Sequence, residues 1–94
     1  MRLTKEQIVC LKTTLKALAP DARIYLFGSR VDDNKRGGDI DLLIISKSLT
    51  KRDLRRLRVE FFKRFGEQKM DIVLDNGEMR DPFVRYILRQ AIEL

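Results

Sequence analysis

The chain has 94 residues, 44% of them hydrophobic, and a formal net charge of +6 at pH 7. It contains no histidine and one cysteine, which excludes an intrachain disulfide, catalysis by Ser-His-Asp or Cys-His groups, and zinc sites of histidines or clustered cysteines. Enzymatic chemistry would have to come from carboxylates, hydroxyls, lysines, arginines and bound metal. The length suits one domain, residues 1–94, and the basic balance favours anionic partners or serves solubility alone.

The first half of the sequence predicts a helix and two strands. Residues 4–18 have helical spacing, with Thr4 and Gln7 as a capping box and Pro20 as a stop signal. Cys10 lies off the apolar stripe, and we interpret it as a small packing residue, with exposure to solvent or a partner as the alternative. Residues 22–27 predict a strand, residues 28–38 a polar loop, and residues 39–45 a second, central strand. The apolar stripe of the helix consists of Ile8, Leu11, Leu15 and Leu18.

The second half predicts a helix, a strand and a last helix. Residues 50–65 have Thr50 as N-cap and Asp53 in the third helical position, and Gly66 follows as the end signal. Residues 69–74 predict a third strand, and Asp81-Pro82 predicts the start of another helix. The order indicates an α+β fold with a small mixed sheet of about three strands flanked by helices. The inner face of the last helix is expected to carry Phe83, Ile87, Leu88 and Ala91.

Two aspartates at the start of the second strand are the first candidate functional residues. Asp39 and Asp41 are alternate residues, so they project from one face with Cα atoms roughly 7 Å apart. Such close carboxylates repel each other unless a cation lies between them or one is protonated. Mg²⁺, which prefers oxygen ligands, suits the pattern. The alternative is a strand-capping or salt-bridged acidic pair with Lys35 or Arg36.

A third carboxylate lies within the otherwise apolar third strand. If that strand pairs beside the second, Asp71 can complete a cluster with Asp39 and Asp41. Asp75 is the fallback, because it shares the face of Asp71 if the strand extends that far. The alternative for Asp71 is an exposed position at the edge of the sheet.

Gly28 and Ser29 follow the first strand and could contact phosphate. Glycine allows the backbone to approach a ligand closely, and the serine hydroxyl with nearby N–H groups can bind phosphate oxygens. By itself, a Gly-Ser pair after a strand is more often an ordinary turn.

The combination of Gly28-Ser29, Asp39, Asp41 and Asp71 resembles the nucleotidyltransferase superfamily that includes DNA polymerase beta. Its smallest members, the minimal nucleotidyltransferases of prokaryotes, are the most similar. Their pattern is a strand, Gly-Ser, a loop of about ten residues, Asp-x-Asp and a later acidic residue; here nine residues separate Ser29 from Asp39.

The resemblance implies a magnesium-dependent enzyme. Two Mg²⁺ ions would be held mainly by Asp39 and Asp41, with Asp71 sharing one of them, and Gly28, Ser29 and Arg30 would hold the phosphates of the substrate. It further implies transfer of AMP from ATP to a hydroxyl of a small helical HEPN-type toxin, with this chain as antitoxin in a hetero-oligomer. Because no signal-peptide pattern or membrane-spanning apolar run occurs, we expect a cytoplasmic protein that does not contact the membrane.

Two other hypotheses remain open. The shortened loop favours an antitoxin or binding module that neutralises its partner by contact, with weak or absent catalysis. The predicted second helix has a basic side opposite its apolar stripe, which is a solvated face, a nucleic-acid contact or a docking site for an acidic partner. No aromatic residue is interleaved with these charges, which argues against base stacking. The basic residues are Arg52, Arg55, Arg56 and Lys63.

Overall fold

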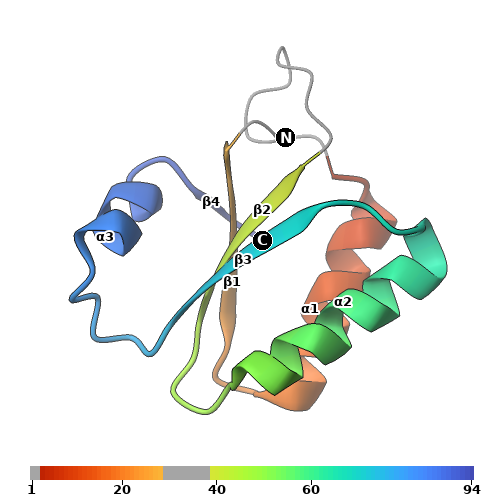
Figure 1. The fold of residues 1–94 in the computed structure, drawn as a ribbon, viewed down its shortest axis with the longest axis horizontal. Coiled ribbons are helices and arrows are strands. Elements are labelled where there is room, and N and C mark those ends of the chain that lie inside the picture. Colours follow the sequence, from red (N-terminus) through yellow and green to blue (C-terminus); the bar gives the residue numbers. More distant parts are fainter. Residues whose placement is uncertain (1–2, 29–38) are drawn as a thin grey trace.

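The computed structural model describes residues 3–28 and 39–94, and within them the fold is α+β with a mixed sheet (Figure 1). The strand order is β3-β2-β1-β4; β2 runs parallel to β3 and antiparallel to β1, and β4 is antiparallel to β1. The predicted fold class is confirmed. The elements are α1 (Lys5–Leu18), β1 (Arg23–Phe27), β2 (Ile40–Ile45), α2 (Lys51–Phe65), β3 (Met70–Asp75), α3 (Pro82–Leu88) and β4 (Ile92–Glu93).

The two faces of the sheet are covered by different helices. Figure 1 shows α1 and α2 together on one side and α3 alone on the other. Side chains alternate along a strand, so β2 contributes to both layers. Ile40, Leu42 and Ile44 join the core under α1 and α2, whereas Leu43 and Ile45 join a smaller cluster with α3.

The ends of the two long helices are where the sequence predicts them. Thr4 Oγ1 accepts a hydrogen bond from the backbone N–H of Gln7 at 3.1 Å, and Gln7 Oε1 accepts one from the N–H of Thr4 at 2.9 Å. Thr50 and Asp53 form the same reciprocal arrangement at the start of α2. Gly66 follows α2 with a φ of 86°, a left-handed value that glycine tolerates. These caps satisfy backbone N–H groups at the helix starts and mark the helix ends locally.

The environment of Cys10 and of α3 tests two further predictions. Cys10, on α1, is buried within the core, which confirms its interpretation as a packing residue. Phe83, predicted to face inward, is 52% exposed, and Ala91 lies beyond the end of the helix. The helix has seven residues, and Val84 and Ile87 are its buried ones. The prediction for Phe83 is wrong because the phase of so short a helix is set by its packing on β2 rather than by its apolar pattern.

A fourth strand, β4, was not predicted. It has two residues, and both are exposed. Tyr25 and Leu26 of β1 pair with it, and the guanidinium of Arg23 contacts the carboxylate of Glu93 at 3.0 and 3.1 Å. Within the described residues, no helix has both the length and the apolar character needed to cross a membrane.

Candidate metal and nucleotide site

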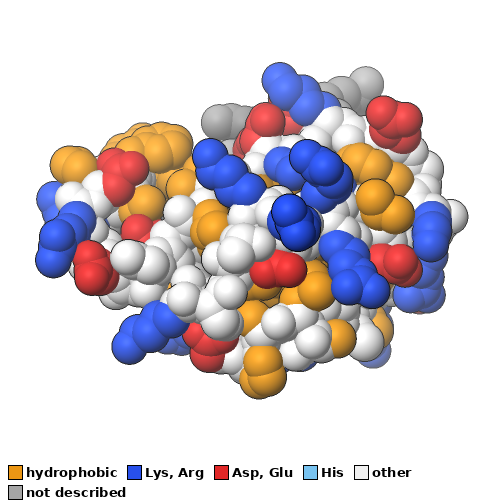
Figure 2. Space-filling view, turned by 60° about the horizontal axis from the view of Figure 1, so that its bottom comes forward, with side chains coloured by type: hydrophobic (Ala, Val, Ile, Leu, Met, Phe, Trp, Pro, Cys, Tyr) orange, Lys and Arg blue, Asp and Glu red, His pale blue; other side chains and the backbone are white. Residues whose placement is uncertain are grey.

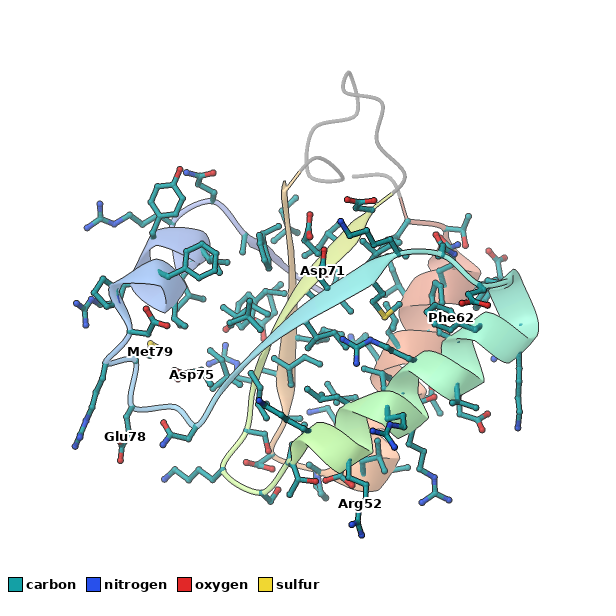
Figure 3. All side chains as sticks on the ribbon, in the orientation of Figure 1. Arg52, Phe62, Asp71, Asp75, Glu78 and Met79 are labelled. Carbon is teal, nitrogen blue, oxygen red and sulfur yellow. The ribbon has the colours of Figure 1, made fainter. Side chains whose placement is uncertain are left out.

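Strands β2 and β3 bring the predicted aspartates to one end of one sheet face. Asp39 directly precedes β2, Asp41 is its second residue, and Asp71 is the second residue of β3. The parallel register pairs Asp41 with Asp71. Adjacent strands lie about 4.8 Å apart, so these two carboxylates project side by side. Asp39, two residues before Asp41, projects from the same face. The labelled Asp71 lies toward one end of β3 in Figure 3.

The pKa of Asp41 records the crowding of these charges. Burial of the half-buried carboxyl group raises its pKa above the ordinary value, and the negative charges of Asp71 and then Asp39 raise it further. The ammonium of Lys69 acts in the opposite direction. A carboxylate in this position gains from either a proton or a nearby cation. A bound cation would therefore relieve the repulsion between the carboxylates of this site.

Lys69 is the cationic residue that the structure places beside the aspartates. Its Nζ lies 3.6 Å from Asp39 Oδ2, and both side chains are largely exposed, so the pair itself stabilises the fold little. The N–H of Ile40 donates to the carbonyl of Lys69 at 3.0 Å, which continues the β2–β3 register by one step. Lys35 and Arg36, the expected partners if the aspartates form a salt-bridged pair, lie outside the described residues. The parallel register of β2 and β3 brings Lys69 beside Asp39, and no sequence pattern indicates that register.

Gly28 lies directly against the side chain of Asp41. The φ of Gly28 is +77°, and a Cβ built there would overlap Asp41 Oδ2 and lie 3.1 Å from its Cγ. Any larger residue would displace the Asp41 carboxylate or the backbone of β1. The glycine is thus required on two grounds, backbone conformation and space. The other expected nucleotide-binding residues, Ser29 and Arg30, lie outside the described residues.

Asp75, the fallback carboxylate, lies at the opposite end of β3. It is paired with Ile45 in the register, and its Oδ2 accepts hydrogen bonds from the N–H groups of Gly77 at 2.8 Å and Met79 at 3.3 Å. Its role is to hold the turn after β3. Figure 3 shows Asp71 and Asp75 well separated along the strand.

The donor chemistry suits a hard divalent cation, because the site offers carboxylate oxygens in a crowded, negatively charged position beside a glycine that leaves room for one of them. In the part of the chain that is described, however, no three carboxylate or thiol side chains are grouped closely enough to hold a metal ion. Asp39, Asp41 and Asp71 thus share a face and an electrostatic environment, and their metal-binding role remains a prediction.

A mixed sheet with acidic residues at the same end of two parallel neighbours, backed by paired helices, is the nucleotidyltransferase fold. Residues 9–93 match the family model of the nucleotidyltransferase domain, and the chain belongs to that family. A solved structure assigned as a minimal nucleotidyltransferase is similar to it, with 27% sequence identity and a TM-score of 0.65 over 99% of this chain and 98% of the other. None of the curated proteins matches the chain significantly.

Proposed function

We propose that this single domain is a magnesium-dependent nucleotidyltransferase that moves a nucleoside monophosphate from a nucleoside triphosphate to an acceptor hydroxyl. The observation that carries the proposal is the placement of Asp41 beside Asp71, with Asp39 on the same face and a raised pKa at Asp41. Membership of the nucleotidyltransferase family supports the reaction type.

The aspartates receive separate roles in this proposal. Asp39 and Asp41 would hold two Mg²⁺ ions, and Asp71 would share the ion nearer to the acceptor. When bound, Mg²⁺ would neutralise the triphosphate and lower the pKa of the acceptor hydroxyl. Gly28, Ser29 and Arg30 would hold the phosphates, with Gly28 also keeping the Asp41 carboxylate in its place.

The chemistry is a displacement at the α-phosphorus. The acceptor oxygen forms a new bond to that phosphorus while the bond to pyrophosphate breaks, and the acceptor proton is released to solvent. Positioning and charge neutralisation are the contributions that the protein would make. The chain needs no histidine for any of these steps, in keeping with its composition.

We further propose that the nucleotide is ATP and that AMP is transferred to a hydroxyl on a small helical HEPN-type protein, which this chain would neutralise as an antitoxin. This finer proposal rests on the resemblance of the Gly28-Ser29, Asp39, Asp41 and Asp71 pattern to the minimal nucleotidyltransferases, and the similar solved structure supports that family. Two aromatic side chains of α3, Phe83 and Tyr86, are 52% and 57% exposed and offer a surface for such a protein.

The test is incubation of the protein with ATP, Mg²⁺ and the product of the adjacent reading frame, followed by intact-mass measurement of both proteins. We expect one or more AMP groups on the partner. Asp39→Asn with Asp41→Asn should abolish the transfer, whereas Asp75→Asn, which alters a carboxylate on the same face at the far end of β3, should retain it. Transfer at an undiminished rate by the double variant would exclude the proposed site.

One observation favours a second candidate function, that of a binding module without catalysis. No three carboxylates are gathered around a common point within residues 3–28 and 39–94. This alternative predicts that the wild-type chain neutralises its partner with no AMP transfer, and that the Asp39→Asn, Asp41→Asn variant does so equally well. Transfer by the wild type, lost in the variant, would reject it.

A further inference from the structure

The positive charge of this chain is concentrated on α2. The helix contains seven lysines and arginines and two acidic residues, a net charge of +5, whereas the whole chain carries +6. A charge placed so unevenly produces a local potential that attracts polyanions. Figure 2, which brings the lower side of Figure 1 forward, shows many Lys and Arg side chains on that side of the molecule, with Asp and Glu side chains among them.

Several of the charges on α2 are already engaged in internal contacts. Arg58 Nε donates to the carbonyl of Met70 at 3.3 Å, the Arg64 guanidinium lies 5.6 Å from the centre of the Phe65 ring, and Lys63 pairs with Glu60 at 3.4 Å. Asp53, the other acid, caps the helix through Thr50. Four exposed cations remain, and within the described part of the chain none of them contacts a carboxylate. They are Lys51, Arg52, Arg55 and Arg56, which we call the α2 basic surface.

The α2 basic surface borders a concave region that extends onto α1. A hollow of about 350 Å³ has Arg52, Arg55 and Arg56 among its lining residues, with Val59 beside them. A second hollow of about 360 Å³ lies between the helices and includes Thr13 and Thr14 of α1. Both hollows include Arg56 and Glu60, so they adjoin. Arg52, Arg55 and Arg56 thus line the first hollow together with Asp53 and Glu60, and Arg56 also borders the second hollow, where Thr13 and Thr14 can donate hydrogen bonds.

The chemistry of this region favours phosphate over a protein surface. Protein interfaces depend on a central group of aromatic or large apolar residues, and Val59, at 45%, is the only large hydrophobic residue of α2 with substantial exposure. The planar guanidinium group of one arginine can donate hydrogen bonds to two phosphate oxygens at once. We propose that the α2 basic surface docks the sugar–phosphate backbone of a nucleic acid, without reading its bases, since no aromatic side chain is available there for stacking.

This surface is separate from the carboxylate site. α2 covers the sheet face opposite to the one that carries Asp41 and Asp71. Figure 3 shows Arg52 projecting from the far end of the molecule relative to Asp71. A nucleic acid held by α2 would therefore leave the candidate nucleotide site free, and the proposal does not depend on that site being active.

The test is fluorescence anisotropy with a labelled duplex DNA and a labelled single-stranded RNA of about 20 nucleotides, at salt from about 50 to about 200 mM. Three or four phosphate contacts predict that log K falls with log salt with a slope of about −3. Arg55→Gln with Arg56→Gln should weaken binding about tenfold or more at low salt and reduce the slope by about 2. The matched control is Arg80→Gln with Arg89→Gln, which removes the same charge near α3, and it should bind like wild type.

Each outcome bears on the proposal. Binding of either probe with the expected slope and loss supports it, and the two probes distinguish DNA from RNA as the source of the backbone. Absence of binding by both probes, a flat salt response, or an equal loss in the control variant would overturn it. Thermal unfolding of both variants verifies that they fold.

Discussion

The two faces of the central sheet carry different kinds of side chain, although the same strands contribute to both. The face under α1 and α2 is apolar along its length, and its core includes fully buried residues from both helices, among them Leu11, Leu15 and Phe61. The opposite face has a smaller apolar cluster with α3 at one end and the aspartates at the other. One face therefore supplies most of the packing that stabilises the fold. The other combines a modest core with the candidate site.

The difference follows from the two-residue period of a strand. In β2, Ile40, Leu42 and Ile44 point to the two-helix face, and Asp41 shares the other face with Leu43 and Ile45. The apolar neighbours on either side of Asp41 in the chain anchor the backbone, so the carboxylate has a defined position without contributing to the core. This arrangement places most stabilising contacts on one face and the candidate site on the other, a contrast that the following experiments test.

The largest effect is expected from the two-helix face. Phe61 is fully buried, with its ring centre 4.9 Å from that of Phe65. Phe61→Ala should lower the free energy of unfolding by about 3–5 kcal/mol, because it removes apolar contacts and leaves a cavity. The matched control is Phe83→Ala on α3, whose exposed ring should matter by less than about 0.5 kcal/mol. Denaturant unfolding measures both, and similar losses in the two variants would contradict the contrast between the faces.

Most of the fold was predictable because its signals are local. The capping boxes at Thr4 and Thr50 and the glycine at 66 mark helix ends through contacts within a few residues. β4 was missed because two residues show no alternation, and its pairing with β1 depends on contacts remote in sequence. The prediction that Phe83 faces inward was wrong for the same reason, because tertiary packing decides which face of α3 is buried.

The candidate site was predictable in its residue types and less so in its contacts. Alternation placed Asp39 and Asp41 on one face, and the structure gives Asp71 the neighbouring position through the β2–β3 register. The closeness of Gly28 to Asp41, and of Lys69 to Asp39, arises where strands meet, and no spacing along the chain encodes it. The metal-binding and nucleotide-binding roles of these residues remain predictions.

The next experiment tests whether Gly28 is needed to keep the Asp41 carboxylate in place. Gly28→Ala should destabilise the protein by about 1–3 kcal/mol, because alanine is strained at a positive φ and its Cβ would overlap the Asp41 carboxylate. It should also weaken binding of Mn²⁺, a paramagnetic substitute for Mg²⁺, measured by water-proton relaxation. Displacement of Asp41 is the physical reason for the second effect.

Gly66→Ala is the matched control for this variant. Gly66 also has a positive φ, of 86°, but a Cβ there would meet nothing within 4 Å. The control should lose stability through backbone strain while keeping the Mn²⁺ affinity of wild type. If both alanine variants bind Mn²⁺ like wild type, the overlap at Asp41 has no functional consequence.

The smallest effect concerns the charge of Asp41 in the metal-free protein. Because burial and the neighbouring carboxylates raise its pKa in the folded state, the folded protein binds this proton more tightly than the unfolded chain. The stability associated with Asp41 is therefore highest below its unfolded pKa of about 3.9 and falls as pH rises through the raised folded-state value. At pH 7 the ionised carboxylate destabilises the fold, and Asp41→Asn should increase the free energy of unfolding by about 0.5 kcal/mol, a modest value because the group is partly exposed.

The difference between Asp41→Asn and wild type isolates the effect of the Asp41 charge and its interactions with Asp39, Asp71 and Lys69, because titrating groups remote from this site act equally in both proteins. It should be present at pH 7 in a chelator, disappear at low pH, and reverse when Mg²⁺ is added, since the cation would stabilise only the chain with the full carboxylate set. Asp75→Asn should instead lower the free energy of unfolding at pH 7, because the carboxylate of Asp75 accepts hydrogen bonds from the N–H groups of Gly77 and Met79. If Asp41→Asn instead lowers stability at pH 7 without metal, Asp41 acts as a structural hydrogen-bond acceptor like Asp75, and the two ends of this sheet face do not differ.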